Sequence, residues 1–422
     1  MNSASSTRAR TSGHRRVAVI GQGFVGLPAA MLAQQAGHLV VGFDTDPDRI
    51  TRLRSGDSYI SDVPSHLLRQ AQESGRYWPT SDTDALDKFD VALVAVPTPV
   101  IGDKPDLSCV EAAAKALAPY LRPGCLVALE STSYPGTTET VFAPILETSG
   151  LRAGRDFHLG YAPERLNPGS GIASIARIPK IVAGIDSESL HAVTEFWQGL
   201  IDTVVPAPDI RTAEVAKLIE NAFRLLNISF VNELAQHARH LGVDVWAALS
   251  LAATKPYGYM EFRPSVGAGG HCLPSDTAYL SWRLHEDART CQLIDTAMAI
   301  NTAQPGYVAD RILTTCTPTA DPPRIVVVGA TYKPDVADVR DSAALKVTDI
   351  LRSRGADVTV VDPLLGHHPG VLTDLTPDMV AHTDLLALLV AHRGLDYPLI
   401  RTASRVFDAC AALTPAPHIE RL

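Results

Sequence analysis

Short apolar runs alternate with stretches of helical periodicity along the first 130 residues of the chain. The run at 16–20 is followed by a glycine turn, a helix-period stretch and a second apolar run that ends at Asp44. Further apolar runs lie at 90–99 and 124–132, and the helix-period stretch 107–121 separates them. Strands that are buried on both faces are continuously apolar, and their alternation with helices is typical of a doubly wound parallel sheet.

The same order recurs near the C-terminus. At 324–365 an apolar run, a glycine turn, a helix-period stretch and a second apolar run end at Asp362. The repeat is loose, because Asp362 follows Gly329 by 33 positions (362 − 329), whereas Asp44 follows Gly21 by 23 (44 − 21). We therefore expect an α/β fold of two Rossmann-like, doubly wound domains.

A long helix-period stretch at 212–242 lies between the two repeats and is expected to join them. Thr212 or Asp209 would open this helix, and Gly242 would close it. One face carries a polar stripe, which consists of Glu214, Lys217, Asn221 and Arg224. Such a stripe is usually a solvated face, but in a helix otherwise this apolar it is also compatible with the lining of a polar site. Both interpretations stay open at this point.

The first glycine turn has the spacing G-x-G-x-x-G, with Gly21, Gly23 and Gly26 between a strand and a helix. These glycines permit the tight turn, the close approach of a pyrophosphate and close helix–strand packing. Asp44 ends the second strand, where it would accept a hydrogen bond from a ribose 2′-hydroxyl and repel a 2′-phosphate. The pattern predicts a dinucleotide site that favours NAD over NADP.

Two further strand ends carry polar or conformationally restricted residues. Pro97 and Thr98 end one apolar run, and Glu130 and Thr132 end the next. Ligands of doubly wound sheets collect at the carboxyl ends of the strands. Turn chemistry alone also explains the prolines.

Composition narrows the classes of protein. The chain has 422 residues, of which 46% are hydrophobic, and its 37 basic and 46 acidic side chains give a formal net charge of −9. This balance argues against nucleic-acid binding. Six widely spaced cysteines without a C-x-x-C pair indicate reduced thiols and a cytoplasmic location, and no stretch approaches the length of a membrane span.

The second glycine turn lacks the G-x-G-x-x-G spacing of the first. Tyr332, Lys333 and Arg340 occupy the turn and the segment after it. A pocket for a phosphorylated ligand would look like this, because Lys and Arg bind phosphate. Ordinary basic surface residues are the alternative.

The motifs, in order, resemble the UDP-glucose and UDP-N-acetylhexosamine 6-dehydrogenases. The resemblance covers about 16–415 and rests on the segments GQGFVG, VAVPTP, ESTSYPGTT, YAPERLNPG, AEVAKLIENAFRLLNI, GAGGHCLPSD and TYKPDVADVRDS. It implies a homodimer through the central helix, with NAD as cofactor and a UDP-sugar as substrate. The domains expected are a flexible tail at 1–14, an NAD-binding Rossmann domain at 15–208, a helical dimerisation domain at 209–305 and a UDP-sugar domain at 306–422.

The resemblance also implies a four-electron oxidation of the sugar C6 alcohol to a carboxylate. Cys272 matches the family's nucleophile, which forms a thiohemiacetal and then a thioester. Lys217 and Asn221 match the residues that stabilise the oxyanion on C6, and Asp276 matches an aspartate that handles protons. Glu164 matches the base of thioester hydrolysis. Thr132 would orient water.

Binding residues are carried over in the same way. The cofactor residues expected are Gly21, Gly23, Phe24, Val25, Gly26, Asp44, Arg49, Pro97, Thr98, Glu130 and Thr132. The substrate residues expected are Glu164, Arg165, Leu166, Lys217, Asn221, Arg224, Lys255, Tyr257, Arg263, Gly269, Tyr332, Lys333 and Arg340. Gly267, Gly269 and Gly270 would let backbone and substrate approach closely.

No metal is expected, because no cluster has zinc-ligand spacing and neighbours in an extended chain, such as His271 and Cys272, point apart. The segments YAPERLNPG, IPKIVAG and AATKPYGYMEF resemble the N-acetylhexosamine branch, above all the UDP-N-acetylglucosamine enzymes, and UDP-glucose is the alternative. Ser265-Val266 and Ser275-Asp276-Thr277 depart from the family pattern, which puts the fit of the sugar C2 substituent in question.

Two rival functions remain. A single-step hydroxyacid dehydrogenase also has a lysine and an asparagine one helical turn apart, but it needs neither Cys272 nor a second nucleotide domain. A non-catalytic NAD- or UDP-sugar-binding protein would be expected to lose Lys217, Cys272 or Asp276, and this chain has all three.

Overall fold

A computed structural model describes residues 13–102, 104–169, 171–270, 272–319, 321–366 and 368–422. The chain divides into two compact units, with the boundary after Leu218. Of the tail predicted at 1–14, only Gly13 and His14 lie within the described residues. The His14 Nδ1 donates to the Gly37 carbonyl at 2.6 Å.

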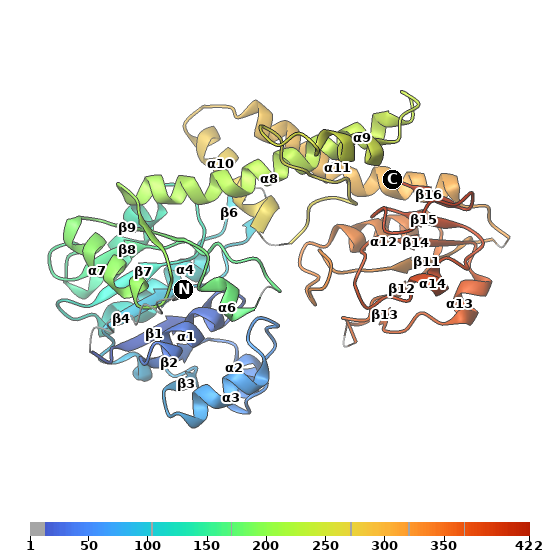
Figure 1. The fold of residues 1–422 in the computed structure, drawn as a ribbon. Helices are drawn as coiled ribbons and strands as arrows, with labels where there is room; N and C mark the ends of the chain where they lie inside the picture. The colour runs from blue at the N-terminus through green and yellow to red at the C-terminus, as the bar shows by residue number, and fades with distance from the viewer. Residues whose placement is uncertain (1–12, 103, 170, 271, 320, 367) are drawn as a thin grey trace, which may run out of the picture. The chain divides into compact units, whose positions relative to one another are not determined.

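The first unit contains an eight-stranded sheet in the order β10-β9-β8-β7-β4-β1-β2-β3 (Figure 1). Its strands are β1 Arg16–Ile20, β2 Leu39–Phe43, β3 Tyr77–Thr80, β4 Val91–Val94, β7 Leu126–Leu129, β8 His158–Tyr161, β9 Lys180–Gly184 and β10 Val204–Pro206. A separate hairpin pairs β5 Val100–Ile101 with β6 Lys104–Pro105. β1 lies between β2 and β4, so the strand order reverses there, as in a doubly wound sheet.

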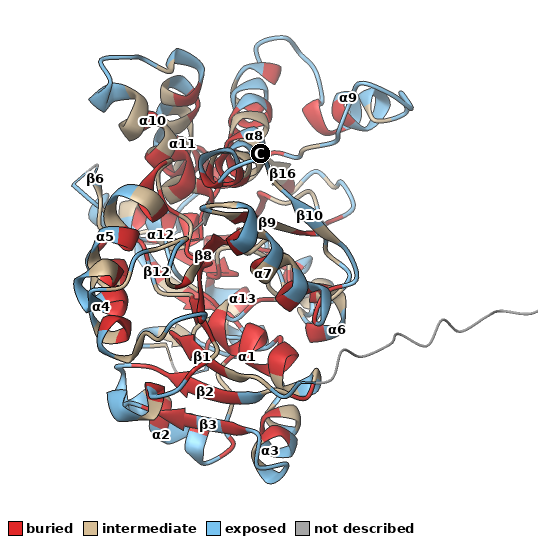
Figure 2. Cartoon of the chain, turned by 90° about the vertical axis from the view of Figure 1, so that its left-hand side faces the viewer, coloured by how far each residue is buried: buried red, intermediate tan, exposed pale blue. Residues whose placement is uncertain are grey.

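Alternate residues of the strands face two separate cores. Val17 and Val19 of β1 belong to one apolar cluster, and Ala18 and Ile20 belong to the other. Figure 2 shows β1 and β2 as almost wholly buried. The helices of this unit are α1 Gly26–Gln35, α2 Pro47–Arg54, α3 Ser65–Glu73, α4 Ser108–Leu117, α5 Ala143–Leu146, α6 Ile172–Ile175 and α7 Ser187–Gln198.

One strand pair departs from the parallel sheet that the sequence predicts. β9 runs antiparallel to β8, with Tyr161 opposite Ala183, whereas the other neighbouring pairs of this sheet are parallel. Parallel neighbours need a crossover connection, usually a helix of several turns. The segment between β8 and β9 contains only the four-residue helix α6, so the chain turns back instead of crossing over.

The second unit contains a six-stranded parallel sheet in the order β13-β12-β11-β14-β15-β16. The strands are β11 Arg324–Val328, β12 Asp357–Val361, β13 Val371–Leu372, β14 Leu385–Leu388, β15 Val406–Asp408 and β16 Ile419–Arg421. The helices are α9 Val245–Ala252, α10 Cys272–Glu286, α11 Gln292–Thr315, α12 Ala343–Ser353, α13 Pro377–His382 and α14 Tyr397–Ile400. The prediction of a second Rossmann-like domain is thereby confirmed.

The long central helix α8 spans Ile210–Ala238 and runs across the boundary between the units. Asp209 precedes it and accepts a hydrogen bond from the Thr212 amide at 2.8 Å, so Asp209 rather than Thr212 caps the helix. None of the helices among the described residues is long and apolar enough to cross a membrane.

Candidate active site

The first glycine turn has the geometry that a dinucleotide requires. Gly21 has φ +88°, and a Cβ there would lie 2.3 Å from the Ala95 carbonyl oxygen. A Cβ on Gly26 would lie 1.8 Å from the Gly21 oxygen, so helix and strand could not pack as they do. Gly23 faces open space, with nothing within 4 Å of its added Cβ. The turn therefore leaves room at Gly23 for a pyrophosphate to approach the backbone.

The Asp44 carboxylate ends β2 beside this turn and is 6% exposed. Its Oδ2 accepts from the Gln22 amide at 2.7 Å and from Arg49 at 2.8 Å, and its Oδ1 accepts from the Asp46 amide at 3.0 Å. An ionised carboxylate oxygen accepts two hydrogen bonds. Oδ1 thus keeps acceptor capacity for a ribose hydroxyl, as the sequence predicts for NAD. Phe24 and Val25 lie half-buried at the start of α1.

The ends of β4 and β7 are joined through polar groups. Thr98 Oγ1 donates to the Thr132 carbonyl at 2.7 Å, and Ser131 Oγ accepts from the Val96 amide at 2.9 Å. Pro97 is exposed between them. These bonds fix the two strand ends side by side at the carboxyl edge of the sheet.

A buried cluster of three charged side chains lies at the same edge. Lys180 Nζ is 2.8 Å from Glu164 Oε2 and 3.4 Å from Glu130 Oε2. Burial raises the pKa of Glu130 to about 7, against the opposing charge of Lys180. Burial also disfavours the charged form of Glu164, but the charge and hydrogen bond of Lys180 outweigh it and hold the pKa of Glu164 below its usual value.

The start of α8 is tied to the β7 edge by Glu214. This side chain is fully buried, and it accepts from the amides of Gly136 at 2.5 Å and Thr138 at 3.0 Å and from the Thr138 hydroxyl at 2.7 Å. Lys217, one turn further, is 7% exposed and acts electrostatically on Glu164. Of the two interpretations of the polar stripe, burial favours an internal polar site at Lys217.

In the second unit, Asn221 Nδ2 donates a short hydrogen bond to Asp276 Oδ2, and both side chains are buried. Asp276 lies one turn beyond Cys272, which is the first residue of α10. The Cys272 side chain and all of His271 lie outside the described residues. Arg224, the last member of the stripe, is exposed, so the stripe does not act as one face.

The glycines before Cys272 pack against the loop at 332–341 of the same unit. A Cβ on Gly269 would lie 2.5 Å from the Asp341 carbonyl oxygen, and one on Gly270 would lie 2.8 Å from the Tyr332 ring. The Gly270 amide donates to the Arg340 carbonyl at 3.1 Å. These glycines therefore permit, above all, the close approach of the loop at 332–341 to the segment before Cys272.

The acid of the second repeat, Asp362, is bonded to groups of its own domain. Asp362 Oδ2 accepts from the Ala330 amide at 2.7 Å and from His392 Nε2 at 2.9 Å. His392 Nδ1 accepts from the Asp335 amide at 2.9 Å, so Nε2 carries the proton. A buried histidine therefore holds this carboxylate in the second repeat, where Arg49 holds Asp44 in the first.

The remaining predicted substrate residues are scattered. Tyr332, Lys333, Arg165 and Leu166 are half-buried, whereas Arg340, Lys255, Tyr257 and Arg263 are exposed. Arg340 forms an ion pair with Asp338 at 2.7 Å, and Arg263 forms one with Glu261 at 2.8 Å. Their roles stay predictions.

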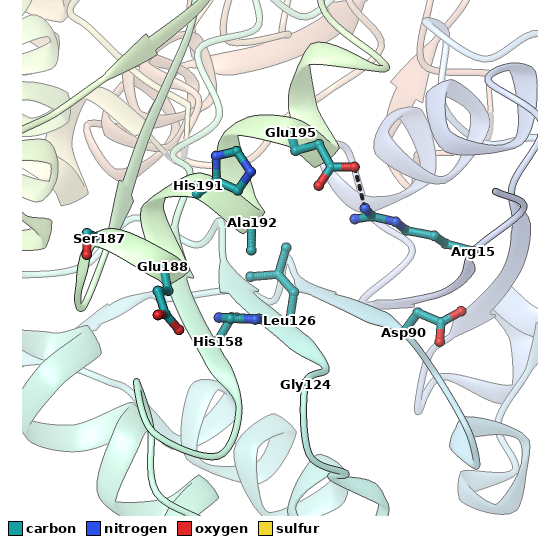
Figure 3. Close-up of a pocket in the computed structure, with 10 residues that line it drawn as sticks. All are labelled: Arg15, Asp90, Gly124, Leu126, His158, Ser187, Glu188, His191, Ala192 and Glu195. Atoms are coloured by element: carbon teal, nitrogen blue, oxygen red, sulfur yellow. Dashed lines mark hydrogen bonds and ion pairs between the residues drawn. The ribbon is translucent and has the colours of Figure 1, made fainter. Parts of the chain in front are cut away.

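A cavity of about 690 Å³ in the first unit is lined by other residues. Figure 3 shows it between α7 and the amino-terminal ends of β4, β7 and β8, with His158 and Leu126 on one side and His191 on the other. Doubly wound sheets bind ligands at the opposite, carboxyl edge.

Among the described residues no group of three His, Cys, Asp or Glu side chains could hold a metal ion.

Sequence reasoning missed Lys180 and Glu214 as members of the site. Lys180 stands alone in the apolar run IPKIVAG, and an isolated charge in a buried strand is the signal that could have identified it. Glu214 was placed on the polar stripe, but its partners lie in a distant loop.

Three family models match the chain in order. They are the NAD-binding domain of the UDP-glucose/GDP-mannose dehydrogenase family at residues 15–200, its central domain at 211–303 and its UDP-binding domain at 326–415. The exact boundaries of our predicted domains stay predictions.

Similar proteins agree with these matches. The UDP-N-acetyl-D-mannosamine dehydrogenase of Pyrococcus horikoshii is 33% identical over 89% of each chain. The UDP-N-acetyl-D-glucosamine 6-dehydrogenase of Pseudomonas aeruginosa is 34% identical over 89% of this chain and 90% of its own. A solved structure of the Pyrococcus horikoshii UDP-D-ManNAc dehydrogenase superposes with a TM-score of 0.87, at 30% identity, over 96% of this chain and 98% of that one. This chain is therefore a member of the UDP-glucose/GDP-mannose dehydrogenase family and an NAD-dependent dehydrogenase.

Proposed function

We propose that this dehydrogenase oxidises the C6 alcohol of a UDP-N-acetylhexosamine to the carboxylate in two hydride transfers, through a thioester on Cys272. The observation that carries the proposal furthest is the buried pair of Asn221 and Asp276, one turn into the helix that begins at Cys272. A buried amide and carboxylate suit a reaction that stabilises an oxyanion and moves protons. The Gly21 turn and Asp44 would hold NAD⁺, which would supply the hydride acceptor.

In the first step the C6 hydroxyl loses its proton while the hydride leaves C6, which gives an aldehyde. Lys217 stabilises the charge that develops on the C6 oxygen, and Asn221 donates a hydrogen bond to the same oxygen. Asp276 accepts the proton. The burial of Lys217 and Asn221 supports these roles, because such groups act more strongly where water is excluded.

In the second step the Cys272 thiolate adds to the aldehyde carbon and forms a thiohemiacetal. An aldehyde has no hydride to give as readily as this adduct, whose second hydride transfer leaves a thioester. Glu164 then takes a proton from water, the water oxygen adds to the acyl carbon, and the thiolate leaves. The lowered pKa of Glu164 supports this role, since only the ionised form can accept the proton.

The N-acetylhexosamine assignment is supported by the two relatives named above, which carry such sugars in their names. The UDP-binding family model over 326–415 supports UDP as the nucleotide. The departure from the family pattern at Ser265 puts the fit of the sugar C2 substituent in question. The Ser265 amide donates a hydrogen bond to the buried Asn232 side chain at 2.8 Å.

The stoichiometry of NADH tests the proposed reaction. Purified enzyme with limiting UDP-N-acetylglucosamine, UDP-N-acetylmannosamine, UDP-N-acetylgalactosamine or UDP-glucose and excess NAD⁺ is followed by absorbance. Two NADH per sugar are expected, with an N-acetylhexosamine as the best substrate. One NADH per sugar would instead identify a single-step alcohol dehydrogenase, and a clear preference for UDP-glucose would refute the assignment of the sugar.

We also propose that two copies of the chain associate through the exposed apolar face of α8. Ile219, Phe223 and Phe230 are 56%, 45% and 54% exposed, and their spacing places them on one side of the helix. A hollow of about 470 Å³ beside them is lined in part by Tyr259 and Met260. An apolar helix face of this kind fits a second copy of itself better than water.

Phe230→Asp is expected to convert the dimer into a monomer, because two buried charges would face each other across the two-fold axis. Light scattering after size-exclusion chromatography measures the mass. Val205→Asp is the matched control, since Val205 is 43% exposed on the edge strand β10, and this variant should stay dimeric. A dimeric Phe230→Asp variant would contradict the assigned interface.

A further inference from the structure

Lys180 is a buried lysine that two carboxylates share. Its side chain is 3% exposed, and those of Glu130 and Glu164 are 0% and 13% exposed. Its Nζ also lies 4.1 Å from the centre of the Trp197 ring, whose face attracts a cation. These three contacts fix one ammonium group in one place, so Lys180 is built into the site and is not a surface charge.

The reversed strand brings Lys180 to the site. Lys180 is the first residue of β9, and β9 runs antiparallel to β8. The amino end of β9 therefore lies at the edge where β7 and β8 end, and where Glu130 and Glu164 follow them in the chain. In a fully parallel sheet, the first residue of this strand would lie at the opposite edge.

We propose that Lys180 is a positioning residue for thioester hydrolysis, and that it holds the Glu164 carboxylate ionised and in one orientation to receive the proton of the attacking water. This inference rests on the proposed function, in which Glu164 is the base. The step balances: the water oxygen bonds to the acyl carbon, the carbon–sulfur bond breaks, one proton passes to Glu164 and Cys272 leaves as the thiolate.

The charges in the cluster assign a second role to Glu130. One lysine can neutralise only one of the two buried carboxylates, and burial raises the pKa of Glu130 to about 7, whereas the pKa of Glu164 is lowered. No group among the described residues donates to Glu130 Oε1. Lys180 acts electrostatically on both carboxylates, and Lys217 acts on Glu164 as well. Glu130 is thus the member that changes charge near neutral pH.

The charge of Glu130 determines how the rate of thioester hydrolysis depends on pH. Below about pH 7 Glu130 is protonated and neutral, so Glu164 is the carboxylate whose charge Lys180 stabilises. Above it the ionised Glu130 competes for Lys180, so Glu164 becomes a stronger base. The rate of thioester hydrolysis is therefore expected to rise as the pH passes through about 7.

Single-turnover experiments separate hydrolysis from hydride transfer. Enzyme in excess over the UDP-sugar is mixed with NAD⁺, NADH is followed optically, and acyl-enzyme is measured by intact mass after acid quench. In Lys180→Met, hydrolysis should slow about 10²-fold, as for the loss of a general base, while the first NADH forms at nearly the wild-type rate. Acyl-enzyme should then accumulate, and Lys180→Arg should restore part of the hydrolysis.

Two further variants complete the test. Glu130→Gln keeps the Lys180–Glu164 pair and should lose the inflection near pH 7 in the hydrolysis rate, which also covers the case that Lys180→Met fails to fold. Lys88→Met is the control, because Lys88 is 78% exposed, and it should behave as wild type.

The outcomes separate the two proposals. Wild-type hydrolysis in Lys180→Met, or an unchanged inflection in Glu130→Gln, would overturn the role of Lys180. Equal slowing of both hydride transfers and hydrolysis would also overturn it, since this is what a merely structural lysine predicts. A wild-type enzyme that forms two NADH without any acyl adduct would refute the thioester mechanism itself.

Discussion

Replacing Cys272 with serine is expected to reduce formation of the uronate at least about 10³-fold, as for the loss of other covalent nucleophiles. A serine hydroxyl is scarcely ionised at neutral pH, so it cannot capture the aldehyde as a thiolate does. Cys272 begins α10, where the helix dipole favours negative charge. The binding of NAD⁺ and of the UDP-sugar should be unchanged, because neither depends on covalent capture. NADH yield and uronate yield measure the effect, and calorimetry measures binding.

The other cysteines provide the controls for this prediction. Burial raises the pKa of Cys410 to about 12 and also raises that of Cys125, so neither is a plausible nucleophile. Cys109→Ser, on α4, should keep full turnover. Turnover of Cys272→Ser within a few fold of wild type would exclude a thioester on this residue.

The parts of the fold that local spacing determines could be predicted from the sequence. The turn at Gly21, the acid Asp44 and the second repeat ending at Asp362 were all predicted, because each depends on a few residues close together in the chain. The reversed direction of β9 was not predicted. An apolar run has no direction in its composition, and the sign of the reversal is that the segment after β8 contains only the four-residue helix α6.

The candidate site was predicted less completely, since it depends on contacts between distant residues. The helix periodicity placed Lys217 and Asn221 one turn apart but could not decide whether water covers them, and both are buried. Lys180 and Glu130 are 50 positions apart, so no local pattern connects them. The glycines before Cys272 were expected to make room for substrate, and the tightest contacts they allow are with Asp341 and Tyr332.

Lys217→Met is expected to slow the first hydride transfer about 10²- to 10³-fold, the usual effect of removing one group from an oxyanion site. Methionine keeps the length and apolar contacts of the buried side chain but has no charge. The ammonium group of Lys217 also acts on Glu164, whose pKa it lowers together with Lys180. The variant should therefore slow hydride transfer most and hydrolysis to a smaller extent. The rate of the first NADH in a single turnover measures the former.

Two comparisons distinguish this charge effect from damage to the fold. Lys115→Met removes an exposed lysine of α4, whose only described ion-pair partner is Glu111, and it should leave the rate unchanged. Glu214 holds the start of α8 through bonds to Gly136 and Thr138 that do not involve Lys217, so the melting temperature of Lys217→Met should stay close to that of wild type. If the first NADH formed at the wild-type rate, the oxyanion role would belong to another residue. Because Lys217→Met acts before the acyl-enzyme forms and Lys180→Met acts after it, the two variants should differ in acyl-enzyme content, with little in the first and much in the second.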